Sequence, residues 1–252
     1  MRIVDLSAPI APSPAELPDI LRTDISYSDH AAGAAGIEGL LGVPARLLRD
    51  GEGWAVEEFT RFGTHNSTHV DAPWHYNSTV AGERAQTIDE LPLELFFGPG
   101  VVLDMTAKAD GEAMTAAEAE AELGRIGHEL AAGEIVLVRT GRDEFYSETD
   151  YMARGCGVTA EATRWLFEQG VRVMGIDAWG WDAPLHMQAA EAIERDERGV
   201  FWAAHQADLP YCQIERLCNL GELPATGFEV ACFPLKIVGA SAGPARAVAI
   251  LR

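Results

Sequence analysis

Three histidines and one aspartate lie close together between residues 63 and 76, in the segment GTHNSTHVDAPWHY. They are His65, His69, Asp71 and His75, in a chain with seven histidines. Imidazole nitrogens and carboxylate oxygens are the ligands that hold zinc and manganese in proteins. The segment is therefore a candidate metal site, and a His-rich strand or loop without a metal is the alternative.

The spacing of these side chains limits how they can meet. His65, His69 and Asp71 have the same parity, so a β-strand would direct all three to one face. A helix would align His65 with His69 and turn Asp71 away. Because four residues of extended strand span about 13 Å, we expect a bend at residues 66–67. A proline then ends the regular ladder, and His75 beyond it is expected where a general base should stand.

This pattern resembles the His-x-Gly-Thr-His-x-Asp-x-Pro-x-His signature of the cyclase-like metal hydrolases, a family that includes bacterial kynurenine formamidase and isatin hydrolase. The resemblance implies that His65, His69 and Asp71 bind a divalent metal, and that His75 is the general acid/base. Ser67 stands where the family has glycine. This exchange removes no ligand and adds a hydroxyl group to the segment.

Further stretches in the C-terminal third, at residues 204–205, 214–220, 233–236 and 240–248, resemble the isatin-hydrolase-like branch of the family. The resemblance implies that His205 and Glu215 hold a second ion, as in two-metal members, or line the substrate pocket. Isatin-hydrolase-like members manage with one metal, so one ion is expected and two are the alternative. Without the resemblance, His205 reads as an ordinary helix histidine, and Glu215 either faces solvent or pairs within the site.

The ligand set implies a hydrolytic reaction. Three protein ligands would leave one coordination position open for water, and the ion would bring the pKa of that water towards neutrality. The resulting hydroxide would attack an amide, lactam or lactone carbonyl. His75, with an ordinary pKa of about 6.5, would take the proton and return it to the leaving group. The expected function is metal-dependent hydrolysis of a cyclic amide, an N-formyl amide or a lactone.

Two other functions fit the same residues. One is a small-molecule-binding protein that uses the ion to hold its ligand, and the other is a non-hydrolytic, metal-dependent cyclase. The cation is expected to be Mn²⁺ or Zn²⁺, because mixed His and Asp ligation suits both. Aromatic side chains at Phe59, Trp74, Trp179 and Trp202 are candidates for holding a flat substrate, although each also suits core packing.

Composition limits the partners of the chain. With 39 acidic and 19 basic residues, the net charge is −20, which argues against binding to nucleic acid or to an anionic membrane. A small-molecule substrate is expected, and the family resemblance implies a homodimer or homotetramer. There is no long apolar run and no Cys-x-x-Cys pair. We therefore expect a cytoplasmic protein without signal peptide or spanning helix, and no zinc role for its four cysteines.

The pattern of apolar runs predicts an α/β fold in a single domain over residues 1–252. Short runs at 101–103, 135–138 and 171–176 are typical of buried strands. Helices are predicted between them, one starting at the Thr115–Glu118 capping box and one at Thr159, so parallel pairing is expected. Further strands are predicted at 2–6, 54–62, 228–232, 234–238 and 245–251. Residues 26–42 read as a long loop with at most one helical turn. The resemblance implies mixed β-sheets that form a barrel-like, swivelling β/β/α core with helices packed outside.

Overall fold

The computed structural model describes residues 1–252, which pack as two compact units. The main unit comprises Met1–Pro9 and Ser67–Arg252, and the small unit comprises Ile10–Asn66. A single domain over the whole chain stays a prediction. No helix has the length and apolar character needed to cross a membrane.

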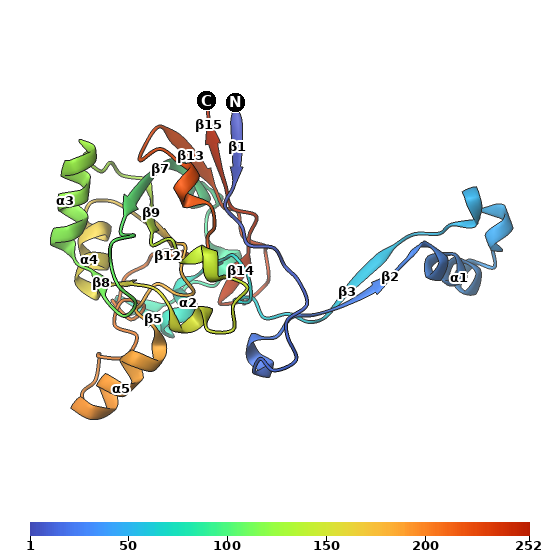
Figure 1. Cartoon of the computed structure of the whole chain (residues 1–252), viewed down its shortest axis with the longest axis horizontal. Helices are drawn as coiled ribbons and strands as arrows, with labels where there is room; N and C mark the ends of the chain where they lie inside the picture. Colours follow the sequence, from blue (N-terminus) through green and yellow to red (C-terminus); the bar gives the residue numbers. More distant parts are fainter. The chain divides into compact units, whose positions relative to one another are not determined.

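A nine-stranded mixed sheet is the centre of the main unit (Figure 1). Its strand order is β1-β15-β13-β7-β9-β11-β12-β4-β14. The strands are β1 (Arg2–Asp5), β4 (His69–Asp71), β7 (Phe97–Asp104), β9 (Ile135–Arg139), β11 (Val173–Ile176), β12 (Cys212–Glu215), β13 (Phe228–Ala231), β14 (Ala242–Pro244) and β15 (Val248–Leu251). Strands β7, β9, β11 and β12 run parallel, and the other neighbours are antiparallel. The sheet curls into a half barrel with helices outside, which confirms the predicted fold class.

The parallel strands are buried on both faces, as their continuous apolar runs predict. Val101 and Leu103 of β7 pack in one hydrophobic cluster with Leu123 of α3 (Ala116–Ile126) and Leu166 of α4 (Ala160–Glu168). Val102, between them in the sequence, belongs to a second cluster with residues of β4, β12 and β13. Successive side chains along each strand point to opposite faces of the sheet. The same run of apolar residues therefore fills both the core layer under the helices and the layer on the concave face.

The predicted helices begin at the predicted residues. The Thr115 side chain accepts a hydrogen bond from the Glu118 amide, and the Glu118 carboxylate accepts one from the Thr115 amide, so α3 starts with a complete capping box. The Thr159 side chain accepts from the Ala162 amide at the start of α4. The main unit also contains α2 (Pro73–Tyr76), α5 (Leu185–Arg195) and two small sheets, formed by β5 (Thr79–Val80) with β6 (Glu83–Arg84) and by β8 (Ala113–Met114) with β10 (Gly157–Val158).

The small unit contains an antiparallel pair, β2 (Asp24–Ser28) with β3 (Val56–Arg61), and helix α1 (His30–Leu41). The prediction of a loop over residues 26–42 is therefore wrong. The Asp29 carboxylate accepts a hydrogen bond from the Ala32 amide at 2.9 Å, and Gly42, with φ of 70°, ends the helix in the left-handed conformation. Alanines and these two caps outweigh the low helix propensity of three internal glycines.

The predicted strands at 2–6, 54–62 and 228–232 correspond to β1, β3 and β13. The prediction of a strand at 234–238 is wrong, because this stretch makes a single bridge, from Pro234 to Ala245. Because proline donates no backbone hydrogen bond, a strand ladder that begins at Pro234 would gain little stability. The predicted strand at 245–251 is shortened to β15, which begins at Val248.

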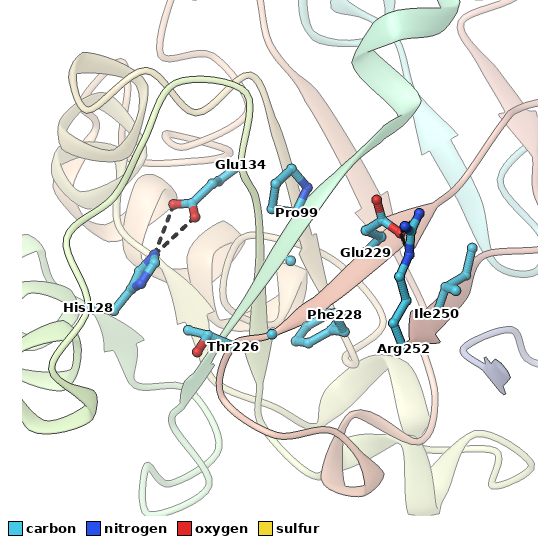
Figure 2. A pocket seen from close by; sticks show the side chains of 10 residues that line it. Pro99, His128, Glu134, Thr226, Phe228, Glu229, Ile250 and Arg252 are labelled. Atoms are coloured by element: carbon cyan, nitrogen blue, oxygen red, sulfur yellow. Dashed lines mark hydrogen bonds and ion pairs between the residues drawn. The ribbon is translucent and has the colours of Figure 1, made fainter. Parts of the chain in front are cut away.

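A pocket of about 390 Å³ lies along β7, β13 and β15 (Figure 2). Its charged side chains already form ion pairs, His128 with Glu134 at 3.0 Å and Arg252 with Glu229 at 2.8 Å. None of the predicted site residues lines this pocket. The predicted site residues lie instead at β4 and its neighbours.

Candidate metal centre

The backbone of the histidine-rich segment has the expected bend. Residues 64–68 form turns and bends, and the regular strand β4 begins at His69. His69 and Asp71 are two residues apart on this strand, so their side chains share one face. Pro73 occupies the first turn of α2, where its missing N–H has no cost, and this single helical turn carries His75.

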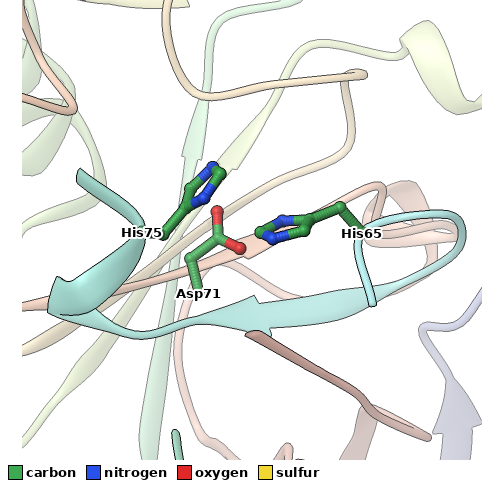
Figure 3. A group of neighbouring side chains, drawn as sticks. All are labelled: His65, Asp71 and His75. Carbon is green, nitrogen blue, oxygen red and sulfur yellow. The ribbon is translucent and has the colours of Figure 1, made fainter. Parts of the chain in front are cut away.

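Asp71 is common to two groups of side chains that could hold a metal ion. In one group, the ligand atoms of His65, Asp71 and His75 lie within 4.8 Å of one another, and Figure 3 shows the Asp71 carboxylate between the two imidazole rings. In the other group, the ligand atoms of His69, Asp71 and Glu215 satisfy the same limit, and all three residues are buried. The roles assigned to these residues from the sequence stay predictions.

The pairing of β4 with β12 brings Glu215 to His69. In the antiparallel register, Glu215 lies opposite His69 and Gln213 lies opposite Asp71. Side chains directly opposite each other across a strand pair share one face and lie close together. His69 Nε2 is accordingly 3.1 Å from Asp71 Oδ1 and 3.7 Å from Glu215 Oε2.

The orientation of the His69 ring is fixed by its other nitrogen. His69 Nδ1 lies 2.7 Å from the Ser67 carbonyl oxygen, which can only accept, so Nδ1 carries the proton of this hydrogen bond. In a neutral imidazole ring, Nε2 then carries a lone pair, and this lone pair faces two carboxylate oxygens. Lone pairs and carboxylates repel, so this arrangement requires a cation among them or a proton on Nε2. The Ser67 Oγ donates to the Ala8 carbonyl at 3.2 Å, which anchors the same turn.

These donors fit a divalent metal ion. Two ligand atoms that are each about 2.1 Å from a tetrahedral zinc ion lie about 3.4 Å apart. The separations of 3.1 Å and 3.7 Å from His69 Nε2 to the two carboxylate oxygens lie on either side of that value. One nitrogen and two carboxylate oxygens suit zinc or manganese, and the carbonyl that holds Nδ1 orients the ring for ligation.

A second histidine approaches Glu215 from the other side. His205 Nε2 is 3.4 Å from Glu215 Oε1, and the same carboxylate oxygen accepts a hydrogen bond from the Trp181 amide at 2.9 Å. His205 Nδ1 lies 2.5 Å from Asp182 Oδ2, and the Asp182 carboxylate also accepts from the backbone amides of Ala204 and His205. Asp182 thus holds the His205 ring with Nε2 directed at Glu215.

Charges in this group stabilise one another. Burial disfavours the charged form of His205, but hydrogen bonds to Asp182 and Glu215 outweigh it and raise the pKa of His205 to about 10. Burial also opposes ionisation of Glu215, and the hydrogen bond from His205 prevails, so the pKa of Glu215 is lowered. Buried carboxylates persist when a nearby cation compensates the lost hydration, and His205 supplies that charge in this structure.

Of the predicted aromatic residues, Trp202 contacts two histidines of this site, and Trp74 is next to one of them in the sequence. Trp202 stacks on the His205 ring with centroids 4.4 Å apart and meets the His75 ring edge-on at 5.0 Å. Trp74 precedes His75 on α2 and is 39% exposed. The Trp202 backbone has φ of 62°, a conformation that non-glycine residues rarely adopt, so the placement of this indole has an energetic cost.

The other two aromatic candidates have different neighbours. Trp179 packs its ring under the Arg216 guanidinium, with Arg216 Cζ 4.8 Å from the ring centroid. Phe59 belongs to β3 of the small unit, where it packs against Phe62 with centroids 5.0 Å apart and remains 55% exposed. Whether any of the four contacts substrate stays a prediction.

Sequence reasoning missed several residues that build this site. Asp182 orients His205 from 23 positions upstream, and no local pattern signals that pairing. Arg216, the residue after Glu215, was also not singled out. The sequence contains one signal for Arg216, namely a charged residue between Glu215 and Leu217, directly after a buried strand. Asp177, at the end of β11, accepts hydrogen bonds from Thr140 and Gly141 and so fixes a turn.

The curled sheet with a buried His and carboxylate cluster at one strand pair defines the class as an α/β protein with a candidate metal centre. Residues 4–183 match the family model described as "Putative cyclase", and the chain belongs to that family.

Individual relatives agree with this assignment. Kynurenine formamidase from Salinibacter ruber is 30% identical over 75% of this chain and 76% of its own length. Isatin hydrolase from Roseibium aggregatum is 29% identical over 75% of this chain and 72% of its own length. The structure of isatin hydrolase A from Ralstonia solanacearum superposes with a TM-score of 0.77, at 25% identity, over 100% of this chain and 92% of that chain.

Proposed function

We propose that this protein is a metal-dependent hydrolase that opens a cyclic amide, an N-formyl amide or a lactone. The observation that carries the proposal is the His69 ring, whose Nδ1 is fixed by a carbonyl while Nε2 faces the carboxylates of Asp71 and Glu215. Several curated relatives support it, because they are kynurenine formamidases or an isatin hydrolase, enzymes that hydrolyse non-peptide C–N bonds.

We assign the first ion to His65, His69 and Asp71, as the family resemblance implies. His205 and Glu215 would hold a second ion or line the substrate pocket. When bound, a divalent cation polarises a carbonyl group and lowers the pKa of a coordinated water. We propose Zn²⁺ or Mn²⁺ as the cation, because both ions bind nitrogen and carboxylate ligands.

His75 is the residue we propose for proton transfer. It lies on the single turn of α2, with its ring near both Asp71 and Trp202. An imidazole can take a proton from the attacking water and return it to the leaving nitrogen. The Trp202 ring meets the His75 ring edge-on, with centroids 5.0 Å apart, and packs against this imidazole.

One experiment tests the metal and the reaction together. The purified protein would be analysed for its elements, loaded with Zn²⁺ or Mn²⁺, and incubated with isatin, N-formylkynurenine and small lactams. We expect one of these metals to co-purify and ring opening or deformylation to stop on chelation. Ligand retention without turnover would identify a binding protein, and dehydration products would identify a cyclase. Either outcome would refute the hydrolase proposal.

We also propose that the chain forms a homodimer or homotetramer. Several apolar side chains on the β2–β3 pair are exposed, among them Tyr27, Val56 and Phe59. Contact with a second copy would remove such surface from water, which favours association. Light scattering on the eluted protein should give two or four times the mass of one chain, and the mass of a single chain would refute the proposal.

The cytoplasm is the compartment we propose. All four cysteines are unpaired thiols, and three of them are buried. Unpaired thiols persist in a reducing compartment, which supports this location. Fractionation of cells that express the protein should recover it with cytoplasmic markers, and recovery with exported proteins would contradict the proposal.

A further inference from the structure

A pocket of about 240 Å³ has His205 in its lining. The lining comes from two stretches of the chain, residues 76–82 and residues 205–209. The first stretch directly follows His75, and the centroids of the His75 and His205 rings lie 5.8 Å apart. Apart from His205, no residue of the lining belongs to the candidate metal ligands. The pocket therefore borders the candidate metal centre and is a place of its own.

Two hydrogen bonds join the stretches that form this pocket. Asp208 Oδ1 accepts from the Ala81 amide at 2.8 Å, at the turn between β5 and β6. Gln206 Nε2 donates to the Tyr76 carbonyl at 3.5 Å. Ala81 and Gly82 have φ of 50° and 83°, and two positive φ angles in succession are typical of a tight hairpin turn. Both walls of the pocket are therefore ordered and connected to each other.

The charges around this pocket favour a cation. Its lining contains no lysine or arginine, and His205 is its one basic residue. Carboxylates contact both nitrogens of that ring, Asp182 Oδ2 at 2.5 Å and Glu215 Oε1 at 3.4 Å. Asp208 is the one acidic residue of the lining, and it forms no ion pair within the chain. The pocket therefore presents a carboxylate whose charge no side chain compensates.

Neutral side chains of the lining add hydrogen-bond acceptors and a small apolar surface. Gln206 uses its Nε2 in the bond to the Tyr76 carbonyl, so its amide oxygen remains an acceptor. The exposed Thr79 hydroxyl accepts as well. Val80 and Leu209 contribute apolar carbon atoms. A ligand of this pocket therefore needs hydrogen-bond donors, and a few methylene groups beside them find apolar contacts.

We propose that this pocket binds a primary ammonium group, with Asp208 as its charged partner and Gln206 and Thr79 as further acceptors. A protonated amine carries three N–H donors and a positive charge, so it matches a carboxylate beside neutral acceptors. The net charge of −20 also draws cations towards the protein. The amine belongs either to the substrate, away from the bond that is opened, or to a separate small molecule. The binding of ammonium does not rest on the proposed function.

The binding is tested without any reaction. Metal-free protein would be titrated with ethylammonium, and with ethanol as the uncharged analogue, by NMR at low ionic strength. We expect the Kd for ethylammonium to rise roughly tenfold in Asp208→Asn, whereas Asp208→Glu keeps the charge and should bind more tightly than Asp208→Asn. Asp29→Asn is the matched control, because Asp29 is also exposed and accepts one backbone amide, that of Ala32 at 2.9 Å. Equal Kd values in wild type and Asp208→Asn, or ethanol binding as tight as that of ethylammonium, would overturn the proposal.

The source of the amine is tested on metal-loaded protein, and this test rests on the proposed function. Two formanilides would be compared, one with a para aminomethyl group and one with a para hydroxymethyl group. If the amine belongs to the substrate, the ratio of their kcat/KM values should favour the aminomethyl compound in the wild type and fall roughly tenfold in Asp208→Asn. An unchanged ratio, with ethylammonium binding still dependent on Asp208, would assign the pocket to a separate amine. Ethylammonium binding without hydrolysis of any amide would support the pocket and refute the hydrolase.

Discussion

Glu215 lies opposite His69 in the β4–β12 pair, with its Oε2 3.7 Å from His69 Nε2. The two residues are far apart in the sequence, and the antiparallel register alone brings them to the same face of the sheet. A nitrogen lone pair and a carboxylate that face each other in a buried place need a cation or a proton between them, which makes this pair a candidate cation site. The same register brings the histidine-rich segment to the surroundings of Glu215. His205 lies beside Glu215 in space, and Arg216 follows it in the sequence.

Metal binding should stabilise the folded protein through His69. An ion present at a hundred times its Kd adds about 2.7 kcal/mol to the free energy of unfolding. We expect thermal unfolding of metal-free protein to shift upwards on addition of Zn²⁺ or Mn²⁺, and the shift to be absent in His69→Ala. His30→Ala is the control, because His30 is exposed on α1. A full shift in His69→Ala would exclude this residue as a ligand.

Replacement of His75 should separate metal binding from turnover. Loss of a general acid/base slows catalysis by about 10²- to 10⁴-fold. His75→Asn should therefore keep the metal content of the wild type and lose activity to that extent. Elemental analysis and initial rates on the same preparation check both properties, with His128→Asn, a residue of the separate pocket in Figure 2, as the control. Undiminished activity in His75→Asn would show that the proton role is wrong.

Asp182 should stabilise the fold through His205. Its carboxylate accepts two backbone amides and the His205 ring, and hydrogen bonds to a charged group contribute about 1.5–3 kcal/mol. Asp182→Asn keeps the shape and removes the charge, so urea unfolding should report a loss of that size. Asp208→Asn, which affects one exposed hydrogen bond to the Ala81 amide, serves as the control. Equal stability of Asp182→Asn and wild type would contradict this role.

Stability should depend on pH through Asp177. Burial raises the pKa of Asp177 from 3.8 to about 6 despite hydrogen bonds from Thr140 and Gly141. The folded state therefore holds this proton more tightly than the unfolded state. The contribution of Asp177 to the free energy of unfolding should increase by about 3 kcal/mol as the pH falls from about 6 to about 4, and stay constant above pH 6.

The difference between wild type and Asp177→Asn isolates this effect, because other carboxylates cancel. Urea unfolding at several pH values between 4 and 7 measures it. Glu118→Gln should retain the same rise between pH 6 and pH 5. The pKa of Glu118 is lowered to about 2, with the hydrogen bond from Lys108 as the main cause, so its stabilising effect is lost only below its ordinary pKa of 4.5. An identical pH profile in Asp177→Asn and wild type would exclude the Asp177 assignment.

Tyr151→Phe should stabilise the ligand-free protein. The Tyr151 hydroxyl is buried without a partner, and such a group costs about 1–3 kcal/mol. Removing it should raise the free energy of unfolding by an amount in that range. Tyr211→Phe is the opposite case, because the Tyr211 hydroxyl donates to the Ala204 carbonyl at 2.8 Å and its loss should destabilise. A destabilised Tyr151→Phe would show that this hydroxyl has a structural role.

The sequence by itself determined the structural features that depend on residues close together in the chain. The strands at 101–103, 135–138 and 171–176 follow from short apolar runs, and α3 and α4 start at caps whose partners are three residues away. The histidine-rich segment can also be recognised in the sequence, because its candidate ligands are concentrated between residues 65 and 75 and a proline ends the strand among them. The prediction failed where local signals conflict. Internal glycines argued against a helix at α1, although both ends of this helix are capped.

Only the tertiary structure decided which distant groups complete the site. The β4–β12 register selected Glu215 as the neighbour of His69, and the loop before α5 carried Asp182 to His205. Neither pairing has a local signature, because strand register is set by the packing of the whole sheet. The unpartnered hydroxyl of Tyr151 was equally invisible, since the absence of a partner can be recognised only when every surrounding side chain has been placed.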